Sequence, residues 1–235
     1  GPIAAAIAAR DPERAEQVLK YMRGVGKYRG ISVPVLRSVS RQFLKADLRN
    51  LPPEQRKMVA FCLMDSQFYC DRFCGVLLLG GDHKTILQGD IEKVLGYFHR
   101  GEFEGWALCD HVSSSIFKNL SRGNRQYTEI IGGFSRENNE WLKRISNVAF
   151  VSLARFGDSH PNFEGFLDLM FSNCANTVQS KFRFTQLGCG WLLRELSLAD
   201  RQKVVAFIRE NLEKMSSEGL RYAIEKMPDD LKKQL

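Results

Sequence analysis

The sequence predicts an all-α fold, built as a curved stack of antiparallel helix pairs. Apolar residues recur with the period of a helix along the chain, and no segment shows the sustained period-two alternation of a β-strand. Helix-start signals recur between these segments, each with a proline whose fixed φ suits the first helical turn. The expected helices are joined by short turns and carry no heptad repeat, which favours stacked pairs over a four-helix bundle.

Three apolar stripes show the helical period most clearly. They run from Ile91 to Phe98, from Leu142 to Phe156 and from Val205 to Met215. The start signals are Asp11-Pro12, Ser32-Val33-Pro34, Pro52-Pro53-Glu54 and, with Asp158 just before it, His160-Pro161. In chain order, the patterns predict helices over residues 3–9, 11–23, 34–46, 53–64, 67–79, 86–99, 104–118, 124–133, 138–156, 162–173, 178–196, 200–213 and 216–227.

A short motif that recurs in two of these helices indicates a degenerate repeat. Trp141-Leu142-Lys143-Arg144 and Trp191-Leu192-Leu193-Arg194 both read W-L-x-R, 50 residues apart, and Trp106 lies 35 residues before Trp141. These distances are close to the roughly 40 to 47 residues of HEAT and armadillo units. We therefore expect one α-solenoid domain over residues 1–235, whose concave face forms a groove for an elongated partner. The opening Gly1-Pro2 is typical of a remnant left by a tag-cleaving protease.

The composition is that of a globular protein from inside a cell. Hydrophobic residues make up 44% and charged residues 26% of the 235 positions. No apolar run approaches the roughly 18 residues that cross a bilayer, so no membrane span is expected. Nothing at the N-terminus resembles a secretory signal and no C-x-x-C pair occurs, which predicts reduced, buried thiols and a location in the cytoplasm, nucleoid or nucleus. The six cysteines are Cys62, Cys70, Cys74, Cys109, Cys174 and Cys189.

Basic residues are concentrated at the start of the chain. Residues 1–50 carry ten Lys or Arg against four Asp or Glu, whereas residues 51–200 carry 16 against 17 and residues 201–235 carry eight against six. A basic first fifth is typical of a surface that meets a polyanion, because each cation beside a phosphate releases condensed counterions. A solvated surface with a chance excess of cations is the alternative.

Several familiar chemical sites are incomplete. Gly80-Gly81-Asp82-His83-Lys84-Thr85 ends like a phosphate loop, but no glycine directly precedes its lysine and no strand leads into it. The four histidines show no metal-ligand spacing, and Cys70 and Cys74 lie one helical turn apart without histidines nearby. We therefore expect neither a metal nor a cofactor. Asp110 and His111 are adjacent on a helix and point in different directions, so the histidine is expected to be solvated.

The segment from Glu104 to Asp110 is more informative. On a helix, the Trp106 indole and the Asp110 carboxylate share one face, one turn apart, among apolar neighbours. A carboxylate in that setting is costly unless it is hydrogen-bonded, paired or used chemically. In the alternative interpretation, Asp110 caps a helix or pairs with an arginine, and Trp106 belongs to the core. Likewise Arg144, one turn after Trp141, is compatible with an ordinary structural ion pair.

Six short motifs follow one another between Asp11 and Met227. They are Pro12-Glu13-Arg14-Ala15-Glu16, Tyr21-Met22, Gly30-Ile31-Ser32-Val33-Pro34, Trp106-x-x-x-Asp110, Asn139-Glu140-Trp141-Leu142-Lys143-Arg144 and Gly190-Trp191-Leu192-Leu193-Arg194-Glu195. In this order and spacing, over nearly the whole chain, they resemble the AlkD-type alkylpurine DNA glycosylases, a family built from HEAT-like repeats.

The resemblance implies a set of site residues. Asp110 falls on the family's catalytic carboxylate, Trp106 and Trp191 on the two indoles that line the lesion site, and Arg144 on the arginine that supports the DNA backbone there. Many relatives carry a second Trp and a second carboxylate just before the catalytic Asp, where this chain has Ala107-Leu108-Cys109. This departure predicts a drier site and an altered substrate range.

The implied reaction is hydrolysis of the N-glycosidic bond of a cationic N3- or N7-alkylated purine in double-stranded DNA. A carboxylate stabilises the positive charge that develops on the sugar and can orient the attacking water. The alkylated purine leaves as a neutral base, so no strong general acid is needed, and the indole faces attract its cationic form. No lysine near Asp110 indicates a Schiff-base lyase, so we expect a monofunctional enzyme, acting as a monomer.

Contacts to DNA are expected from the basic start of the chain and from the helix that leads to Trp191. The loop from Gly24 to Gly30 is glycine-rich enough to approach a DNA backbone closely. The family is associated with holding the duplex along the concave surface and contacting the lesion through its backbone, without a deep pocket. The candidate DNA contacts are Tyr21, Lys27, Arg29, Ser32, Lys181 and Phe184, of which Phe184 is equally compatible with a core position.

Two other functions are compatible with the sequence. One is a helical-repeat protein without catalysis that binds distorted or branched DNA, or another protein, since some branches of the family have lost the catalytic residues. The other is a scaffold with no nucleic-acid role, in which the N-terminal charge is incidental. Because Trp106, Asp110, Arg144 and Trp191 all occur in register, we favour an active enzyme.

Overall fold

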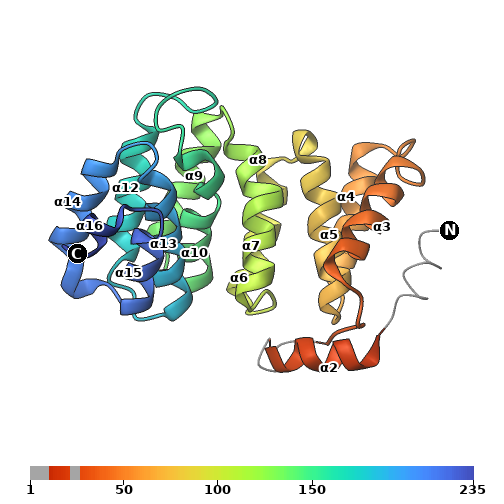
Figure 1. The fold of residues 1–235 in the computed structure, drawn as a ribbon. Helices are drawn as coiled ribbons and strands as arrows, with labels where there is room; N and C mark the ends of the chain where they lie inside the picture. Colours follow the sequence, from red (N-terminus) through yellow and green to blue (C-terminus); the bar gives the residue numbers. More distant parts are fainter. Residues whose placement is uncertain (1–10, 22–26) are drawn as a thin grey trace. The chain divides into compact units, whose positions relative to one another are not determined.

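The structure, a computed structural model, describes residues 11–21, apart from the side chain of Tyr21, and residues 27–235 (Figure 1). The helix predicted over residues 3–9 lies outside this range. The described residues form helices and no β-strand, with an isolated bridge between Lys27 and Phe68. The predicted all-α class is therefore confirmed. None of the described helices is long and apolar enough to cross a membrane.

The chain divides into two compact units. The first comprises Gly1–Val94 and Phe103–Ile116, and the second comprises Leu95–Glu102 and Phe117–Leu235. Both are built from packed helices. The single repeat domain expected over residues 1–235 and its concave face stay predictions.

The first unit is centred on α5. Its helices are α2 (Pro12–Tyr21), α3 (Val33–Lys45), α4 (Pro53–Met64), α5 (Tyr69–Gly81), the start of α6 (Gln88–His99), α7 (Trp106–Val112) and most of the π-helix η2 (Ser113–Phe117). A short 3₁₀ turn, η1 (His83–Thr85), follows α5. Helices α3, α4 and α7 all pack against α5, which explains why residues along nearly its whole length are buried (Figure 1).

The second unit is centred on α13. Its helices are α8 (Lys118–Ser121), α9 (Arg125–Gly133), α10 (Glu140–Val148), α11 (Val151–Ala154), α12 (Phe166–Thr177), α13 (Arg183–Leu196), α14 (Arg201–Asn211), α15 (Ser217–Ile224) and α16 (Asp229–Lys232), with 3₁₀ turns η3 (Phe134–Arg136) and η4 (Leu212–Lys214). Helices α10, α11, α12, α14 and α15 pack against α13, whose Leu192, Leu193 and Leu196 are completely buried. Burial of such apolar faces is the main source of stability in a helical stack.

Three of the four proline-marked helix starts are confirmed. Helices α2 and α4 begin at Pro12 and Pro53, and α3 begins at Val33 with Pro34 in its first turn. Proline suits these positions because its fixed φ matches the helix and its missing N–H would have had no partner in the first turn.

The helix start predicted at Pro161 is wrong. Helix α12 begins only at Phe166, and the Asp158 carboxylate accepts a hydrogen bond from Leu167 N at 2.7 Å across the intervening loop. Within that loop, Asn162 Nδ2 donates to two carbonyl oxygens at 3.0 and 2.7 Å. These side-chain bonds satisfy backbone groups without a helix and therefore compete with helix formation.

Two helices predicted as continuous are interrupted. The segment 104–118 is divided into α7, the π-helix η2 and α8, and Ser113 Oγ in η2 donates to Cys109 O at 2.8 Å. The segment 138–156 is divided into α10 and α11 by a turn at Ala149 and Phe150. Hydroxyl groups that bond to the preceding turn disturb the regular backbone ladder, which the apolar spacing alone does not reveal.

The cysteines are all free thiols, and most are buried as predicted. Cys74 is half-buried and Cys62 is exposed, so the prediction of a buried thiol is wrong for Cys62. The reason is its place on α4: Met58, one turn earlier, is 65% exposed and marks the outward face of this helix.

We expect Gly80→Ala to destabilise the first unit by about 2–3 kcal/mol, because it overpacks a close backbone contact. A Cβ at Gly80 in α5 would lie 2.3 Å from the carbonyl oxygen of Ser115 in η2. Gly89→Ala in α6 is the control, since a Cβ there meets nothing within 4 Å and alanine favours a helix. Urea unfolding measures both variants; equal stabilities would contradict the close approach of α5 and η2.

Candidate active site

Helix α7 carries the predicted catalytic carboxylate in the first unit. It begins at Trp106 and ends at Val112. Trp106 and Asp110 are half-buried, whereas Leu108 between them is buried. The four-residue spacing places the indole and the carboxylate on one side of the helix. α7 thus has a core face and a second face on which Trp106 and Asp110 lie one turn apart.

The chemistry available on this face is that of a carboxylate beside an indole. A carboxylate can stabilise a developing positive charge and orient or deprotonate a water molecule, and an indole face attracts cations. Among the residues that the structure describes, no group of three His, Cys, Asp or Glu side chains is arranged to hold a metal ion.

His111, next to Asp110, is packed rather than solvated, which corrects the expectation from the sequence. Its ring centroid lies 4.1 Å from that of Phe73 in α5, with the planes at 59°. Burial, with a smaller contribution from the positive charge of Arg37, lowers the pKa of His111 to about 4. The imidazole is therefore neutral at pH 7 and places no positive charge beside the carboxylate.

This histidine makes stability depend on pH. In the unfolded chain His111 takes up a proton near pH 6.5, whereas in the folded chain it does so only near pH 4. Because the unfolded state then binds more protons, the free energy of unfolding falls as the pH drops from 6.5 to 4, by up to about 3 kcal/mol. Urea unfolding at pH 7 and pH 4 is expected to show this loss in the wild type and not in His111→Gln. Parallel losses in both proteins would contradict it.

The N-terminal residues expected to contact DNA lie against α5. Arg29 forms a bidentate ion pair with Asp71, with Nε–Oδ1 and Nη2–Oδ2 distances of 2.9 and 2.7 Å. Its guanidinium carbon also lies 3.7 Å from the centroid of the Phe68 ring. Lys27 is exposed, and its Nζ donates to Gln67 Oε1 at 2.7 Å. The charge of Arg29 is thus compensated by a carboxylate, whereas Lys27 is bonded to a neutral amide.

The other N-terminal candidates are partly outside the described residues. Ser32 is the half-buried N-cap of α3 and makes no capping hydrogen bond through its side chain. The side chain of Tyr21 and residues 22–26, which include the start of the glycine-rich loop, are not described. Gly30, at φ 71°, lies directly against the backbone of Asp11. A Cβ at Gly30 would lie 2.0 Å from Asp11 O. This glycine therefore serves an internal backbone contact.

Helix α10 in the second unit carries Arg144. Asn139 starts this helix by accepting hydrogen bonds through Oδ1 from Trp141 N and Leu142 N at 2.9 and 3.2 Å. Arg144 is only 5% exposed, and its Nη1 donates to Phe184 O at 2.5 Å. The guanidinium therefore joins α10 to the first turn of α13.

Phe184 belongs to an aromatic cluster with Trp141 and Phe182. Its ring stacks on that of Trp141 with centroids 5.6 Å apart, and Phe182 meets Trp141 edge-on at 5.0 Å. All three side chains are half-buried, and Lys181 beside them is exposed. Phe184 is therefore partly packed in this cluster and partly exposed, so it has features of both positions that the sequence left open.

Trp191 lies further along α13 and is half-buried. The guanidinium carbon of Arg194 is 5.9 Å from its ring centroid. Arg194 is paired with Glu195 and Glu225 at 3.0 and 2.6 Å, so the indole stands beside a cation whose charge is compensated. Trp106 and Asp110 belong to the first unit, and Arg144 and Trp191 to the second.

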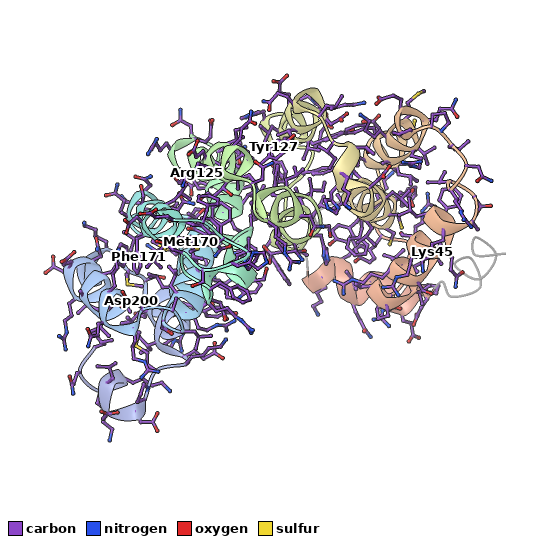
Figure 2. All side chains as sticks on the ribbon, turned by 90° about the horizontal axis from the view of Figure 1, so that it is seen from above. Lys45, Arg125, Tyr127, Met170, Phe171 and Asp200 are labelled. Carbon is purple, nitrogen blue, oxygen red and sulfur yellow. The ribbon has the colours of Figure 1, made fainter. Side chains whose placement is uncertain are left out.

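Helix α3 carries a basic stripe that the predicted DNA contacts do not include. Arg37, Arg41 and Lys45 follow one another at four-residue intervals, and all three are exposed (Figure 2 labels Lys45). None of them forms an ion pair with a residue that the structure describes. The stripe extends over about 12 Å of helix. Its i, i+4, i+8 spacing is visible in the sequence and is the signal that identifies it.

These features define an all-helical repeat protein with a carboxylate and an indole on one helix face and a basic stripe on another helix. The chain belongs to the DNA alkylation repair enzyme family, whose model matches residues 3–227. The resemblance inferred from the motifs is thereby confirmed.

Several solved structures are similar to this chain, and two of them are described here. One is described as a predicted DNA alkylation repair enzyme from Enterococcus faecalis; it has a TM-score of 0.79 and 18% sequence identity, over 94% of this chain and 97% of that one. The other is AlkD2 from Streptococcus mutans, with a TM-score of 0.60 and 15% identity, over 92% and 98% of the two chains. At these identities the likeness shows the shared helical-repeat fold. No curated protein matches the sequence.

Proposed function

We propose that this protein is a monofunctional DNA glycosylase that hydrolyses the N-glycosidic bond of cationic N3- or N7-alkylated purines in duplex DNA. The observation that carries the proposal is the half-buried Asp110 carboxylate, one turn after Trp106 on α7, in a chain of the DNA alkylation repair enzyme family. The similar structure from Enterococcus faecalis is itself described as a predicted DNA alkylation repair enzyme, which supports this proposal.

In the proposed reaction, water attacks C1′ of the damaged nucleotide as the bond from C1′ to the purine nitrogen breaks. The bonding electron pair moves onto the alkylated base, which leaves neutral, and the sugar carries positive charge in the transition state. Asp110 stabilises that charge and accepts the proton of the attacking water. The neutral His111 beside it adds no positive charge next to the carboxylate.

The indoles and Arg144 are assigned to binding around the lesion. Trp106 and Trp191 favour the cationic nucleotide, each by roughly 0.5–2 kcal/mol depending on how far the contact is desolvated. Arg144 holds a phosphate near the lesion. Its hydrogen bond to Phe184 O keeps the guanidinium in place.

Duplex DNA is bound through phosphate contacts that position the protein without reading sequence. The basic stripe on α3 and Lys27 supply charge for these contacts in the first unit, and Lys181 with Phe184 in the second. Arg29 contributes less, because Asp71 compensates its charge. Tyr21 and Ser32 complete the proposed contacts, and the protein acts as a monomer.

The proposal is tested with three DNA ligands: a duplex with one 7-methylguanine, the same duplex with one uracil, and a four-way junction. We expect release of the cationic base alone, because uracil needs a proton donor to leave as a neutral base. Preferential binding of the junction, with no base released from either duplex, would instead support a non-catalytic protein that recognises branched DNA.

A further inference from the structure

One carboxylate joins the first turns of α10 and α13. Glu140, the first residue of α10, accepts through Oε2 from Ser180 Oγ at 2.6 Å and from Thr185 Oγ1 at 2.8 Å. Its Oε1 accepts from Lys143 Nζ at 2.8 Å. The bonds of Glu140 to Ser180 and Thr185 are called the Glu140 anchor below, because they hold both ends of the segment that leads into α13.

Glu140 is not needed to start its own helix. Asn139 already accepts hydrogen bonds from Trp141 N and Leu142 N, two of the N–H groups that have no partner within the first turn. The Glu140 side chain instead bonds to residues 40 and 45 positions later in the chain. Its place at the start of α10 therefore serves a contact between two helices.

The Glu140 anchor is charged and largely enclosed. Thr185 is completely buried, and its Oγ1 also lies 2.9 Å from Glu140 O. Burial raises the pKa of Glu140, but hydrogen bonds from Lys143 and the two hydroxyl groups lower it by more, so that the pKa lies below its usual value. The carboxylate is therefore ionised at pH 7, and hydrogen bonds to an ionised acceptor are stronger than neutral ones.

Arg144 extends the same contact by one turn of α10. Its Nη1 donates to Phe184 O at 2.5 Å, and Phe184 directly precedes Thr185. The carbonyl group that receives the guanidinium thus lies inside the segment that the Glu140 anchor holds. Supporting hydrogen bonds of this kind keep a functional side chain in one rotamer.

Gly188 leaves room for the Arg144 side chain against α13. A Cβ at Gly188 would lie 3.3 Å from Arg144 Cγ and 3.5 Å from Arg144 Nη1. Arg144 is only 5% exposed, so close packing encloses its stem. With its stem packed on α13, the direction of the guanidinium depends on where the Phe184 carbonyl group lies.

We propose that Glu140 and Thr185 are positioning residues, which set the place of the Arg144 guanidinium through the carbonyl group of Phe184. This inference deepens the proposed glycosylase function and rests on it for the catalytic consequence. In that function Arg144 holds a phosphate near the damaged nucleotide. A displacement of about 1 Å in such a contact can lower a reaction rate by up to about 100-fold.

Thr185→Val and Thr185→Ser form a matched pair, since valine keeps the shape of the side chain and serine keeps its hydroxyl group. Thr185→Val is expected to lower the single-turnover rate of 7-methylguanine release about 10-fold at saturating protein. Thr185→Ser is expected to stay within about threefold of the wild-type rate. The rates are compared at a temperature at which both variants are folded, and equal rates would overturn the role of Thr185.

Glu140→Gln tests the carboxylate itself, with Glu137→Gln as its control. Glu137 is exposed and lies three residues before Glu140, so both substitutions remove one negative charge from the same region. We expect a loss of about 10-fold in Glu140→Gln and none in Glu137→Gln. Equal rates in the two variants would show that Glu140 does not position the site.

The Arg144→Gln background separates positioning from a general weakening of the fold. If Thr185 acts through Arg144, Thr185→Val changes the rate by less than about twofold once the guanidinium is absent, because the two residues belong to one interaction. A further loss of about 10-fold in that background would overturn the proposal, since independent effects multiply.

A last measurement does not depend on activity. The Nε–H resonance of Arg144 is identified by its absence in Arg144→Gln, and its hydrogen exchange is followed by NMR. Exchange is expected to be at least about 10-fold faster in Thr185→Val than in Thr185→Ser, because the guanidinium is held less firmly. Equal exchange would overturn the positioning role. An inactive wild type in which exchange still differs would contradict the proposed glycosylase and support the positioning of Arg144.

Discussion

Asp110→Asn is expected to lower the single-turnover rate of base release by at least about 100-fold, while the affinity for the duplex stays within about threefold. Asparagine keeps the size of the side chain and one acceptor oxygen but carries no negative charge. The half-buried position on α7 makes this loss large, because a partly desolvated carboxylate stabilises a developing cation more strongly than an exposed one. The measurement compares release of 7-methylguanine with duplex binding under the same buffer conditions.

Glu104→Gln is the matched control for this substitution. Glu104 is an exposed carboxylate two residues before Trp106, so its replacement removes the same charge from the same region. We expect the control to release the base at the wild-type rate. An unchanged rate in Asp110→Asn would reject the assigned catalytic role, and equal losses in both variants would indicate a general effect of charge rather than a catalytic group.

Replacing the basic stripe, Arg37, Arg41 and Lys45, by glutamine is expected to weaken duplex binding about 100-fold or more at low salt. Each cation that neutralises a phosphate adds about 0.9 to the slope of log affinity against log salt, so the slope should become shallower by nearly 3. The three side chains are exposed and form no ion pair with described residues, so little of their charge is compensated within the protein. Fluorescence anisotropy of a labelled duplex at several salt concentrations measures both quantities.

A second triple variant, Arg201→Gln with Arg209→Gln and Lys214→Gln, is the control for net charge. These three residues are exposed at α14 and η4 of the second unit. The control loses the same charge, and we expect it to keep a salt slope within about one of the wild-type value. Equal slopes for the two triple variants would show that the basic stripe is not a phosphate-binding surface.

Local sequence signals predicted most of the fold. Helix starts at Pro12, Pro34 and Pro53 depend on the φ of proline and on the first-turn N–H, both of which are properties of a short segment. The start predicted at Pro161 failed because the Asp158 carboxylate accepts from Leu167 N, nine residues later, so the helix begins beyond an intervening loop. The π-helix after α7 was also unpredictable, since the apolar spacing there is the same for an α-helix.

Local sequence signals also predict only part of the candidate site. The shared face of Trp106 and Asp110 is a property of one helix and follows from four-residue spacing. The ion pair between Arg29 and Asp71 joins residues 42 positions apart, so nothing in the sequence near Arg29 indicates that its charge is compensated. The burial of His111 likewise depends on a ring in a different helix.

The glycosylase function is tested most directly by single-turnover release of 7-methylguanine from a defined duplex by the wild-type protein. We expect first-order release of the free base, leaving an abasic site, at a rate well above spontaneous depurination of the same duplex. Tight duplex binding with no release beyond the spontaneous rate would contradict it.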